Sequence, residues 1–481
     1  MAVKKQLAAD MATKWRNVLV VLALFALWQP VLGQDFDVPL PGAEPSDSGL
    51  STVTPASSEQ FVDVGTASDI LLAAEPAAVK YPTNIQLSGV FQADGVVFSQ
   101  DDANRAPLNE GGVGYLENGG DFRRARLGAK ATLAANMNAF MQMDFAAPGR
   151  PTFTDVWVEW TDLPVLGNVR VGQWKQPFSL EVVSSFRYTT FMERSSLFQA
   201  FTPFRHLGVG FYDHTEDLNS TWAASYFRTG QDQFGGSLST SGGNGMAARI
   251  TRLLGYDDSD GTNYLHLGGA YFLNSPPHHS IAFRTIPEIF VGQNANNGVG
   301  TAGFAVPGVF DGTPFFVNTG SLPEVEHVHT FGVEALWVAG PLSVQAESMA
   351  AVVDRAVDST ATLAGSYVQV GYFLTGEHRP YDRKSGAIDR VKPLEDFQWY
   401  GNGDGCYHGC GAWEVALRFS NIDLNDADIR GGVMNNLTGG LNWYCNPYCK
   451  VVLNYIHSWR ESPGGVDSEM NAFALRTQMD F

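Results

Sequence analysis

The last eleven residues of the chain, Asn471–Phe481, alternate with a period of two. Every second residue from Phe473 to Phe481 is Phe, Leu, Thr, Met or Phe, whereas Ala, Arg, Gln and Asp stand between them. A β-strand produces this period and a helix does not. Because a tilted strand needs about 9–11 residues to cross an outer membrane, the segment predicts one membrane-spanning strand at the end of the chain.

The final residue, Phe481, strengthens this prediction. Outer-membrane β-barrels typically finish with a strand that ends on an aromatic residue, and the barrel assembly machinery is thought to read that end. We therefore expect Phe481 to be the point at which the chain contacts this machinery. The expectation requires that the rest of the chain carry the same alternation.

The first 33 residues have the form of a secretory signal peptide. Basic residues precede the apolar run Val18–Trp28, and the short segment Val31–Gly33 offers a signal-peptidase site before Gln34. The run is too short for a stop-transfer helix, and no later apolar run approaches the roughly 18 residues that a membrane-spanning helix requires. The sequence therefore predicts a secreted chain that is periplasmic, extracellular or an outer-membrane barrel.

Residues 34–83 form a leader rich in Pro, Ser, Ala and acidic residues. Sparse hydrophobic residues and negative charge predict disorder, either as a passive linker or as a periplasmic tether. The whole chain has a net charge of -19, and residues 1–33 contribute +3, so the remainder carries -22. This acidity argues against a nucleic-acid partner. It does not determine which ion a pore passes, because the local charge at a constriction decides that.

Residues 84–481 carry sixteen alternating segments whose connections alternate between short and long. An even number of strands with short turns on one side is typical of an outer-membrane β-barrel. The predicted fold is therefore all-β, a transmembrane antiparallel barrel of about 16 strands with an inward-folded third loop. The connection 375–411 is too long for a turn, so it holds an inward-folded segment or the strand count is wrong there. The segments are approximately 84–98, 121–134, 137–146, 153–161, 167–174, 207–214, 220–230, 245–253, 263–273, 328–339, 342–353, 366–374, 412–423, 436–444, 451–459 and 471–481.

Several stretches, taken in order, resemble the phosphate-selective porin O and P family. They include FRRARLG at 122–128, NVRVGQWKQPF at 168–178, TFMER at 190–194 and GAWEV at 411–415. The resemblance implies a usually trimeric outer-membrane porin whose third loop lines an anion path with basic side chains. It implies a homotrimer in outer-membrane lipid that passes small anions such as phosphate and carries no cofactor. General non-specific porins and structural barrels with a plugged lumen remain alternatives.

Basic residues on the predicted strands support a polar lumen. Arg124, Arg126 and Lys130 share one face of the second strand, and Arg170 and Arg249 each stand between apolar neighbours. A basic side chain at the lipid midplane costs about 2–4 kcal/mol. These five residues are therefore predicted to face the lumen.

The long third loop is locally basic within an acidic chain. Its four basic residues outnumber Glu181 and Glu193, which favours small anions at the narrowest point. By family resemblance Arg194 contacts the anion near the pair Ser184 and Ser185, whereas the neighbouring Glu193 permits an alternative in which Arg194 only holds the loop. Val182 departs from phosphate-specific members, which carry Lys at this position. The basic residues are Lys175, Arg187, Arg194 and Arg205.

The four cysteines form two CxxxC pairs, Cys406–Cys410 and Cys445–Cys449. Strand order places both pairs on the oxidising periplasmic side, so all four are disulfide candidates whose connectivity stays open. A metal site with His408 is disfavoured because it has no second supporting cluster. None of the ten His stands beside Ser or Asp in a catalytic arrangement, so we predict no enzymatic activity.

Overall fold

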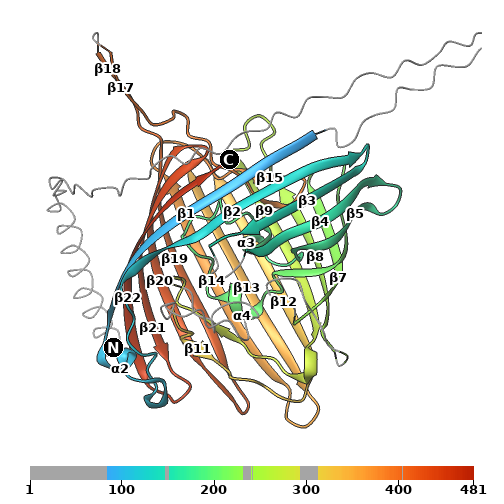
Figure 1. The fold of residues 1–481 in the computed structure, drawn as a ribbon, viewed down its shortest axis with the longest axis vertical. Helices are drawn as coiled ribbons and strands as arrows, with labels where there is room; N and C mark the ends of the chain where they lie inside the picture. Colours follow the sequence, from blue (N-terminus) through green and yellow to red (C-terminus); the bar gives the residue numbers. More distant parts are fainter. Residues whose placement is uncertain (1–83, 147–150, 231–239, 241, 293–312, 403–404) are drawn as a thin grey trace, which may run out of the picture. The chain divides into compact units, whose positions relative to one another are not determined.

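The computed structural model describes residues 84–146, 151–230, 240, 242–292, 313–402 and 405–481, without the side chains of 399–402 and 405–408. The predicted signal peptide and leader therefore lie outside the described residues. The strands close into one antiparallel barrel, which confirms the predicted fold class (Figure 1). Each of the sixteen predicted segments overlaps one barrel strand. The strands are β1 (Asn84–Gln100), β2 (Gly119–Ala134), β3 (Met137–Asp144), β4 (Thr152–Leu163), β5 (Gly167–Lys175), β6 (Arg205–His214), β7 (Ser220–Arg228), β8 (Asn244–Leu254), β9 (Asn263–Ser275), β12 (Val325–Ala339), β13 (Leu342–Arg355), β14 (Ala361–Phe373), β19 (Ala412–Asp426), β20 (Ile429–Asn446), β21 (Cys449–Glu461) and β22 (Asp467–Asp480).

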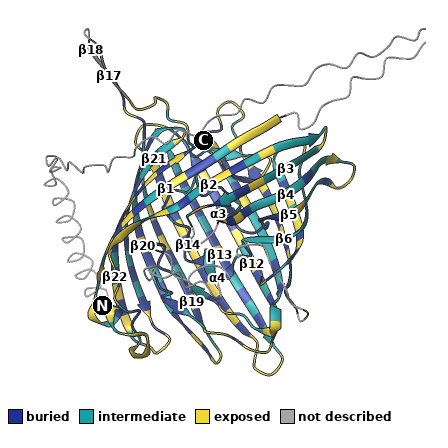
Figure 2. Cartoon of the chain, viewed as in Figure 1, coloured by how far each residue is buried: buried dark blue, intermediate teal, exposed yellow. Residues whose placement is uncertain are grey.

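The two-residue period separates a lipid-facing surface from a lumen-facing surface. In β22, Leu475 and Met479 are exposed, whereas Arg476 and Gln478 are buried inside the barrel. The same alternation of exposed and buried positions runs along most strands (Figure 2). Apolar side chains can face lipid without cost, while the charged ones require the polar interior.

The barrel wall is not equally tall around its circumference. Strands β3, β5 and β7 have 8, 9 and 9 residues, whereas β12, β19 and β20 have 15, 15 and 18 (Figure 1). The helices of the described residues are single turns, such as α2 (Asp102–Arg105), α3 (Leu180–Val183) and α4 (Leu197–Phe201). In that part of the chain, no helix combines the length and apolarity needed to cross a membrane.

The first and last strands close the barrel. Strand β1 pairs antiparallel with β22, and beyond that register the Gly89 N–H donates to the Phe481 carbonyl at 3.0 Å. The Phe481 N–H returns the bond to the Gly89 carbonyl at 3.2 Å. A Cβ at Gly89 would lie 2.4 Å from the Phe481 ring, so glycine is what allows the terminal aromatic residue to sit at this seam.

The long connection between β14 and β19 turns into the barrel mouth. Its short strands are β15 (Tyr381–Asp382) and β16 (Ala387–Ile388), and Arg249 of the wall donates to its Gly386 carbonyl at 2.7 Å. The strand count is therefore intact, and the connection holds the inward-folded segment. Beyond it, β17 (Gln398–Asn402) and β18 (Gly405–Gly409) pair as a hairpin that projects away from the barrel (Figure 1).

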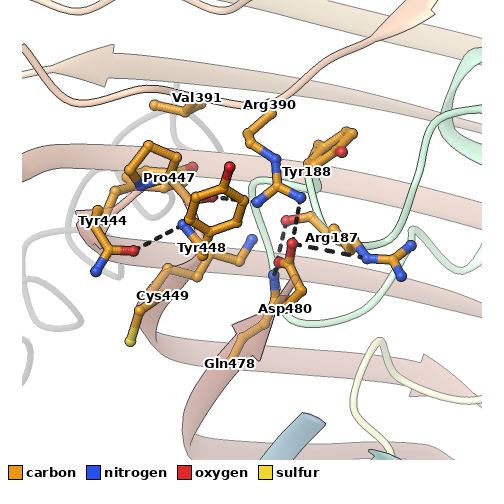
Figure 3. Close-up of a pocket in the computed structure, with 12 residues that line it drawn as sticks. Arg187, Tyr188, Arg390, Val391, Tyr444, Pro447, Tyr448, Cys449, Gln478 and Asp480 are labelled. Carbon is orange, nitrogen blue, oxygen red and sulfur yellow. Dashed lines mark hydrogen bonds and ion pairs between the residues drawn. The ribbon is translucent and has the colours of Figure 1, made fainter. Parts of the chain in front are cut away.

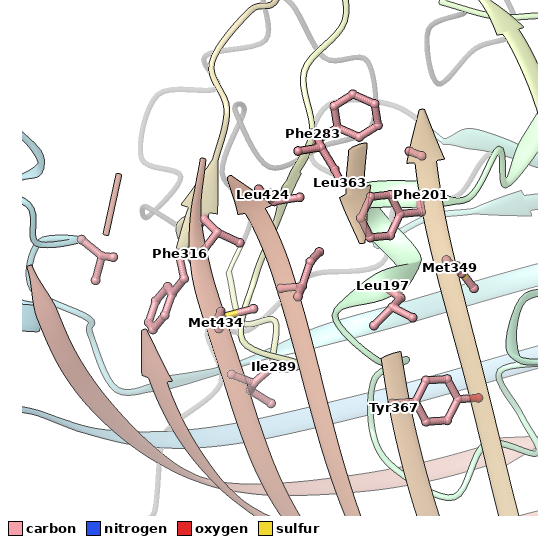
Figure 4. Packing of buried hydrophobic residues seen from close by; sticks show 14 of the residues in the cluster. Leu197, Phe201, Phe283, Ile289, Phe316, Met349, Leu363, Tyr367, Leu424 and Met434 are labelled. Carbon is pink, nitrogen blue, oxygen red and sulfur yellow. The ribbon is translucent and has the colours of Figure 1, made fainter. Parts of the chain in front are cut away.

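A hydrophobic cluster fills one side of the lumen. Leu197 and Phe201 of α4 lie near Leu363 and Met349 of the wall, and Ile289 from the loop after β9 belongs to the same cluster (Figure 4). The loop after β9 also forms the short pair β10 (Arg284–Thr285) and β11 (Val317–Asn318). Full burial of a Leu or Phe side chain contributes about 1.5–3 kcal/mol, so this packing holds both loops inside the barrel.

Candidate functional site: the loop that crosses the lumen

The third loop, residues 176–204 between β5 and β6, reaches the opposite wall. The backbone N–H groups of Leu180 and Glu181 donate to the Glu347 carboxylate of β13 at 3.1 and 2.9 Å. Farther along the loop, Asn442 of β20 donates its side-chain amide to the Thr190 carbonyl at 2.8 Å. These contacts carry the loop across the lumen and divide the space inside the barrel.

Three wall arginines hold the loop through Glu193. Arg123, Arg124 and Arg476 lie 2.9, 3.4 and 2.7 Å from its carboxylate oxygens. Burial alone would raise the pKa of Glu193, but the three guanidinium groups hold it well below its usual range. Glu193 is therefore an ionised anchor at neutral pH.

Arg123 contacts the third loop but was not among the residues predicted to face the lumen. By strict parity it lies opposite to Arg124 and would face lipid. The β1–β2 register shifts between Gln92 and Ala93, leaving Arg123 without a register partner and allowing it to turn inward. The cost of an arginine in lipid was the signal in the sequence that could have indicated such a bulge.

A second anchor joins the third loop to the loop after β9. Arg418 of β19 lies 3.4 Å from Glu181 and 2.6 Å from Glu288, and both carboxylates are buried. Burial raises the pKa of Glu181, and Arg418 only partly offsets this. The alternation pattern gave no indication of the partnership between Arg418 and Glu288, because these residues are 130 positions apart.

Arg194 braces the loop from within. Its Nε donates to the Glu181 carbonyl at 2.7 Å and its NH2 to the Ser184 carbonyl at 3.2 Å. Burial lowers the pKa of Arg194 to about 10, so it stays charged at neutral pH. Arg194 therefore holds the loop through its carbonyls, and the neighbouring Glu193 pairs with the wall arginines instead. Contact between Arg194 and a permeating anion stays a prediction.

Lys175, at the end of β5, holds the same stretch of loop. Its Nζ donates to the carbonyls of Val182, Val183 and Ser184 at 2.8, 3.3 and 2.7 Å. The Ser184 hydroxyl accepts from the Ile388 N–H of the connector at 3.0 Å. The Ser185 hydroxyl accepts from the Arg187 N–H at 3.3 Å, so both serines shape the loop in this structure.

Most of the predicted basic wall residues have carboxylate partners. The row is therefore far less positive than its residue count indicates, because each pair cancels locally. Lys130, near the other end of β2, is exposed. The ion pairs are Arg126–Asp144 at 2.7 Å, Arg205–Asp155 at 2.7 Å, Arg249–Glu334 at 2.6 Å, and Arg170 with Glu159, whose Nε bond measures 2.8 Å.

A cavity of about 270 Å³ lies between strands β4–β8, the third loop and the connector. Four cationic and two acidic side chains line it, which leaves a local charge of +2 inside an acidic protein. The charged lining residues are Arg170, Lys175, Arg249, Lys384, Asp155 and Asp213.

The cysteines gather at the end of the barrel where the chain terminates. Cys410, Cys445 and Cys449 form no disulfide in the structure. The side chains of Cys406 and His408 lie outside the described residues, so the connectivity stays a prediction. In the described part of the chain, no group of three or more His, Cys, Asp or Glu side chains is arranged to hold a metal ion.

The closed sixteen-stranded barrel with a loop across its lumen defines an outer-membrane channel protein. The chain belongs to the phosphate-selective porin O and P family, whose profile matches residues 99–481. It is located in the bacterial outer membrane, and its family and fold point to a channel rather than an enzyme.

Individual relatives are distant from this chain. Porin O of Pseudomonas aeruginosa is 24% identical over 338 residues, which cover 65% of this chain and 70% of that protein. An uncharacterized protein of Caulobacter vibrioides is 26% identical over 457 residues, covering 92% and 83%. The fold is also similar to the anion-selective porin from Comamonas acidovorans, with a TM-score of 0.47, 11% identity, and coverage of 83% and 99%.

Proposed function

We propose that this porin passes small anions in preference to cations and that phosphate-like oxyanions are its favoured solutes. The observation that carries the proposal is Lys175, a lumen cation that borders the 270 Å³ cavity and donates to three backbone carbonyls. Among the described residues, no carboxylate forms a salt bridge with Lys175 or with Arg194. Arg194 is buried and Lys175 is partly buried. Asp155 and Glu181 lie close enough to attract them, so their charge is only partly balanced by carboxylates, in contrast to the directly paired wall arginines.

The physical basis is electrostatic attraction in a narrow polar space. Two unit charges about 8 Å apart interact by roughly 2 kcal/mol at an effective dielectric constant of 20. Lys175 therefore acts through its field, because its three donors already bind the loop. Arg170 and Arg249 also border the cavity, and guanidinium groups match the oxygens of phosphate through their fork of donors. The description of the family as phosphate-selective supports this solute class.

We also propose a homotrimer, which the family resemblance supports. The short strands β3, β5 and β7 offer a low wall against which another copy can pack. Cross-linking in outer-membrane vesicles tests this, and a ladder that stops at the monomer overturns it.

A barrel with a plugged lumen is the second candidate function. The hydrophobic cluster around Leu197, Phe201 and Ile289 fills one side of the lumen and narrows it. Conductance in a planar bilayer separates the two candidates, because a plugged barrel gives no open-channel steps in KCl.

The reversal potential in a KCl gradient tests the anion preference. We expect a potential that reports anion preference in wild type, and Lys175→Gln to lower the anion-to-cation permeability ratio by roughly three- to tenfold. Arg194→Glu inverts the charge of the second cation that forms no salt bridge among the described residues, and is expected to lower the ratio further. Lys392→Gln, an exposed charge on the connector, is the matched control. A cation-preferring wild type, or an unchanged ratio in a folded Lys175→Gln protein, overturns the proposal.

A further inference from the structure

A pocket lies where the third loop, the connector and the end of β22 meet (Figure 3). Arg187 comes from the loop, Arg390 from the connector and Asp480 from the last strand. The turn between β20 and β21 completes the lining. Because short turns and the chain terminus lie on the periplasmic side of such barrels, the pocket is at the periplasmic end of the lumen.

The Asp480 carboxylate sits between the two arginines. Arg390 donates to its Oδ1, and the Arg187 Nε lies 3.9 Å from the same oxygen (Figure 3). Gln478 donates to Oδ2 at 3.1 Å. Asp480 is 2% exposed, whereas the arginine side chains are 16% and 19% exposed, so the guanidinium groups reach solvent and the carboxylate does not.

The pocket holds more positive than negative charge. Lys450, 5% exposed, also lines it and donates to the Thr189 carbonyl at 3.0 Å. The lining therefore holds two guanidinium groups and one carboxylate, beside the buried amine of Lys450. Burial lowers the pKa of Arg187, and Asp480 partly offsets this. One carboxylate cannot neutralise two guanidinium groups.

Little space remains beside the carboxylate. The free volume is about 10 Å³, which is room for about one water molecule. An oxyanion can therefore bind both guanidinium groups only by taking the place of Asp480. The carboxylate is chemically equivalent to such a ligand, since it presents two anionic oxygens to the same donors.

We propose that this pocket is an exit site for small oxyanions, in which Asp480 competes with the permeating ion for Arg187 and Arg390. The proposal rests on the anion preference proposed above. The arginines attract an ion that has passed the third loop, and the returning Asp480 carboxylate displaces it into the periplasm. Conduction requires that a site bind the ion strongly enough for it to enter and weakly enough for it to leave. Competition from the Asp480 carboxylate weakens the binding of the ion to the two arginines.

Substitutions of Arg187 and of Asp480 should change oxyanion binding in opposite directions. Arg187→Gln removes a donor whose only ion pair among the described residues is the long contact with Asp480, so it should weaken oxyanion binding without breaking a strong pair. Asp480→Asn removes the competing charge at nearly constant volume, so it should strengthen binding. If the triad only tethers the connector to β22, both changes affect stability and neither affects ion binding.

The experiment is block of chloride current by inorganic phosphate in planar bilayers. We expect Arg187→Gln to raise the half-blocking phosphate concentration about tenfold and Asp480→Asn to lower it several-fold. Lys392→Gln, which removes a charge two residues from Arg390 but outside the pocket, should leave it unchanged. Arg187→Lys keeps the positive charge but loses the paired donors of the guanidinium group. Its half-blocking phosphate concentration should lie between those of wild type and Arg187→Gln.

The outcomes separate this site from the proposed function. Phosphate block in wild type with the same half-blocking concentration in Arg187→Gln overturns the exit site alone. A wild type that prefers cations and is insensitive to phosphate overturns the anion preference and the exit site together. If Asp480→Asn assembles poorly, Arg187→Gln and Arg187→Lys still decide the question.

Discussion

The lumen-facing side chains are buried on one half of the barrel wall and partly exposed on the other. On β14 and β19, lumen-facing residues such as Leu363, Tyr367 and Ile422 are 0–3% exposed, because the inward loops pack on them. On β5 to β7, lumen-facing residues such as Arg170, Tyr212 and Ala223 stay partly exposed and border the 270 Å³ cavity. One half therefore serves as the core for the loops and the other as the boundary of the aqueous path.

The 270 Å³ cavity therefore lies on one side of the lumen, opposite the packed cluster. The Arg418–Glu288 ion pair, which fastens two loops, is on the packed half. Lys175, which forms no salt bridge with another described residue, borders the cavity on the open half. Changes on the packed half should therefore act on stability, and changes on the open half on permeation.

A substitution where β1 meets β22 should have the largest effect, because both halves of the wall form only when the barrel closes there. Phe481→Asp places a charge where the ring lies against Gly89, and we expect the yield of heat-modifiable protein in the outer membrane to fall severely. Val357→Asp, in an exposed loop, is the control. Normal assembly of Phe481→Asp would count against a role for this residue in insertion.

On the packed half, Arg418→Ala should destabilise the folded barrel by about 3–5 kcal/mol, because it leaves Glu288 buried without its charge partner. Urea unfolding in lipid vesicles measures this. Arg430→Gln, an exposed arginine on the next strand, should stay within about 0.5 kcal/mol of wild type. Equal midpoints for the two variants would mean that the loops are not held through Arg418.

Thiol labelling compares the two halves directly. In a background with the native cysteines changed to serine, Ala223→Cys on the open half should react with a charged methanethiosulfonate reagent and reduce the current. Leu363→Cys on the packed half should remain unlabelled, because Leu363 is fully buried. Similar labelling rates at both positions would show that the loops leave the packed half accessible.

The smallest effect concerns pH and the Glu193 anchor. The pKa of Glu193 in the folded protein lies below its ordinary value of 4.5, so its contribution to stability is present above pH 4.5. This contribution is lost as the pH falls through the lowered pKa of the folded state. Glu193→Gln should therefore show a weaker decline of the unfolding midpoint on acidification below pH 4.5, with the exposed Glu326→Gln as control. Parallel pH curves for wild type and Glu193→Gln would contradict the anchor.

The strands could be predicted from the sequence because lipid on one side and a polar lumen on the other impose a local two-residue pattern. Connection lengths then indicated the antiparallel order. The inward fold of the connector was only one of two readings, because its contacts, such as Arg249 with Gly386, join residues 137 positions apart.

The sequence predicted which basic residues belong to the candidate site but not which groups they bind. The sequence indicated which basic residues face the lumen, since lipid would penalise them. It could not indicate that Arg249 meets Glu334, because this contact depends on the register of β8, β9 and β12. It could not indicate that Arg194 meets backbone carbonyls, because this contact depends on how the third loop folds. A strict two-residue period does not place Arg123 on the lumen face, because it does not include the bulge opposite Gln92 and Ala93.

The unequal height of the wall has a consequence for the surrounding bilayer. An eight-residue strand such as β3, at about 3.3 Å per residue and a 45° tilt, rises only about 19 Å, less than the roughly 25 Å apolar band of such barrels. The 18-residue β20 rises about 42 Å by the same arithmetic. A lone copy would therefore have to thin the bilayer along one flank only, whereas a neighbouring copy against that flank removes the mismatch.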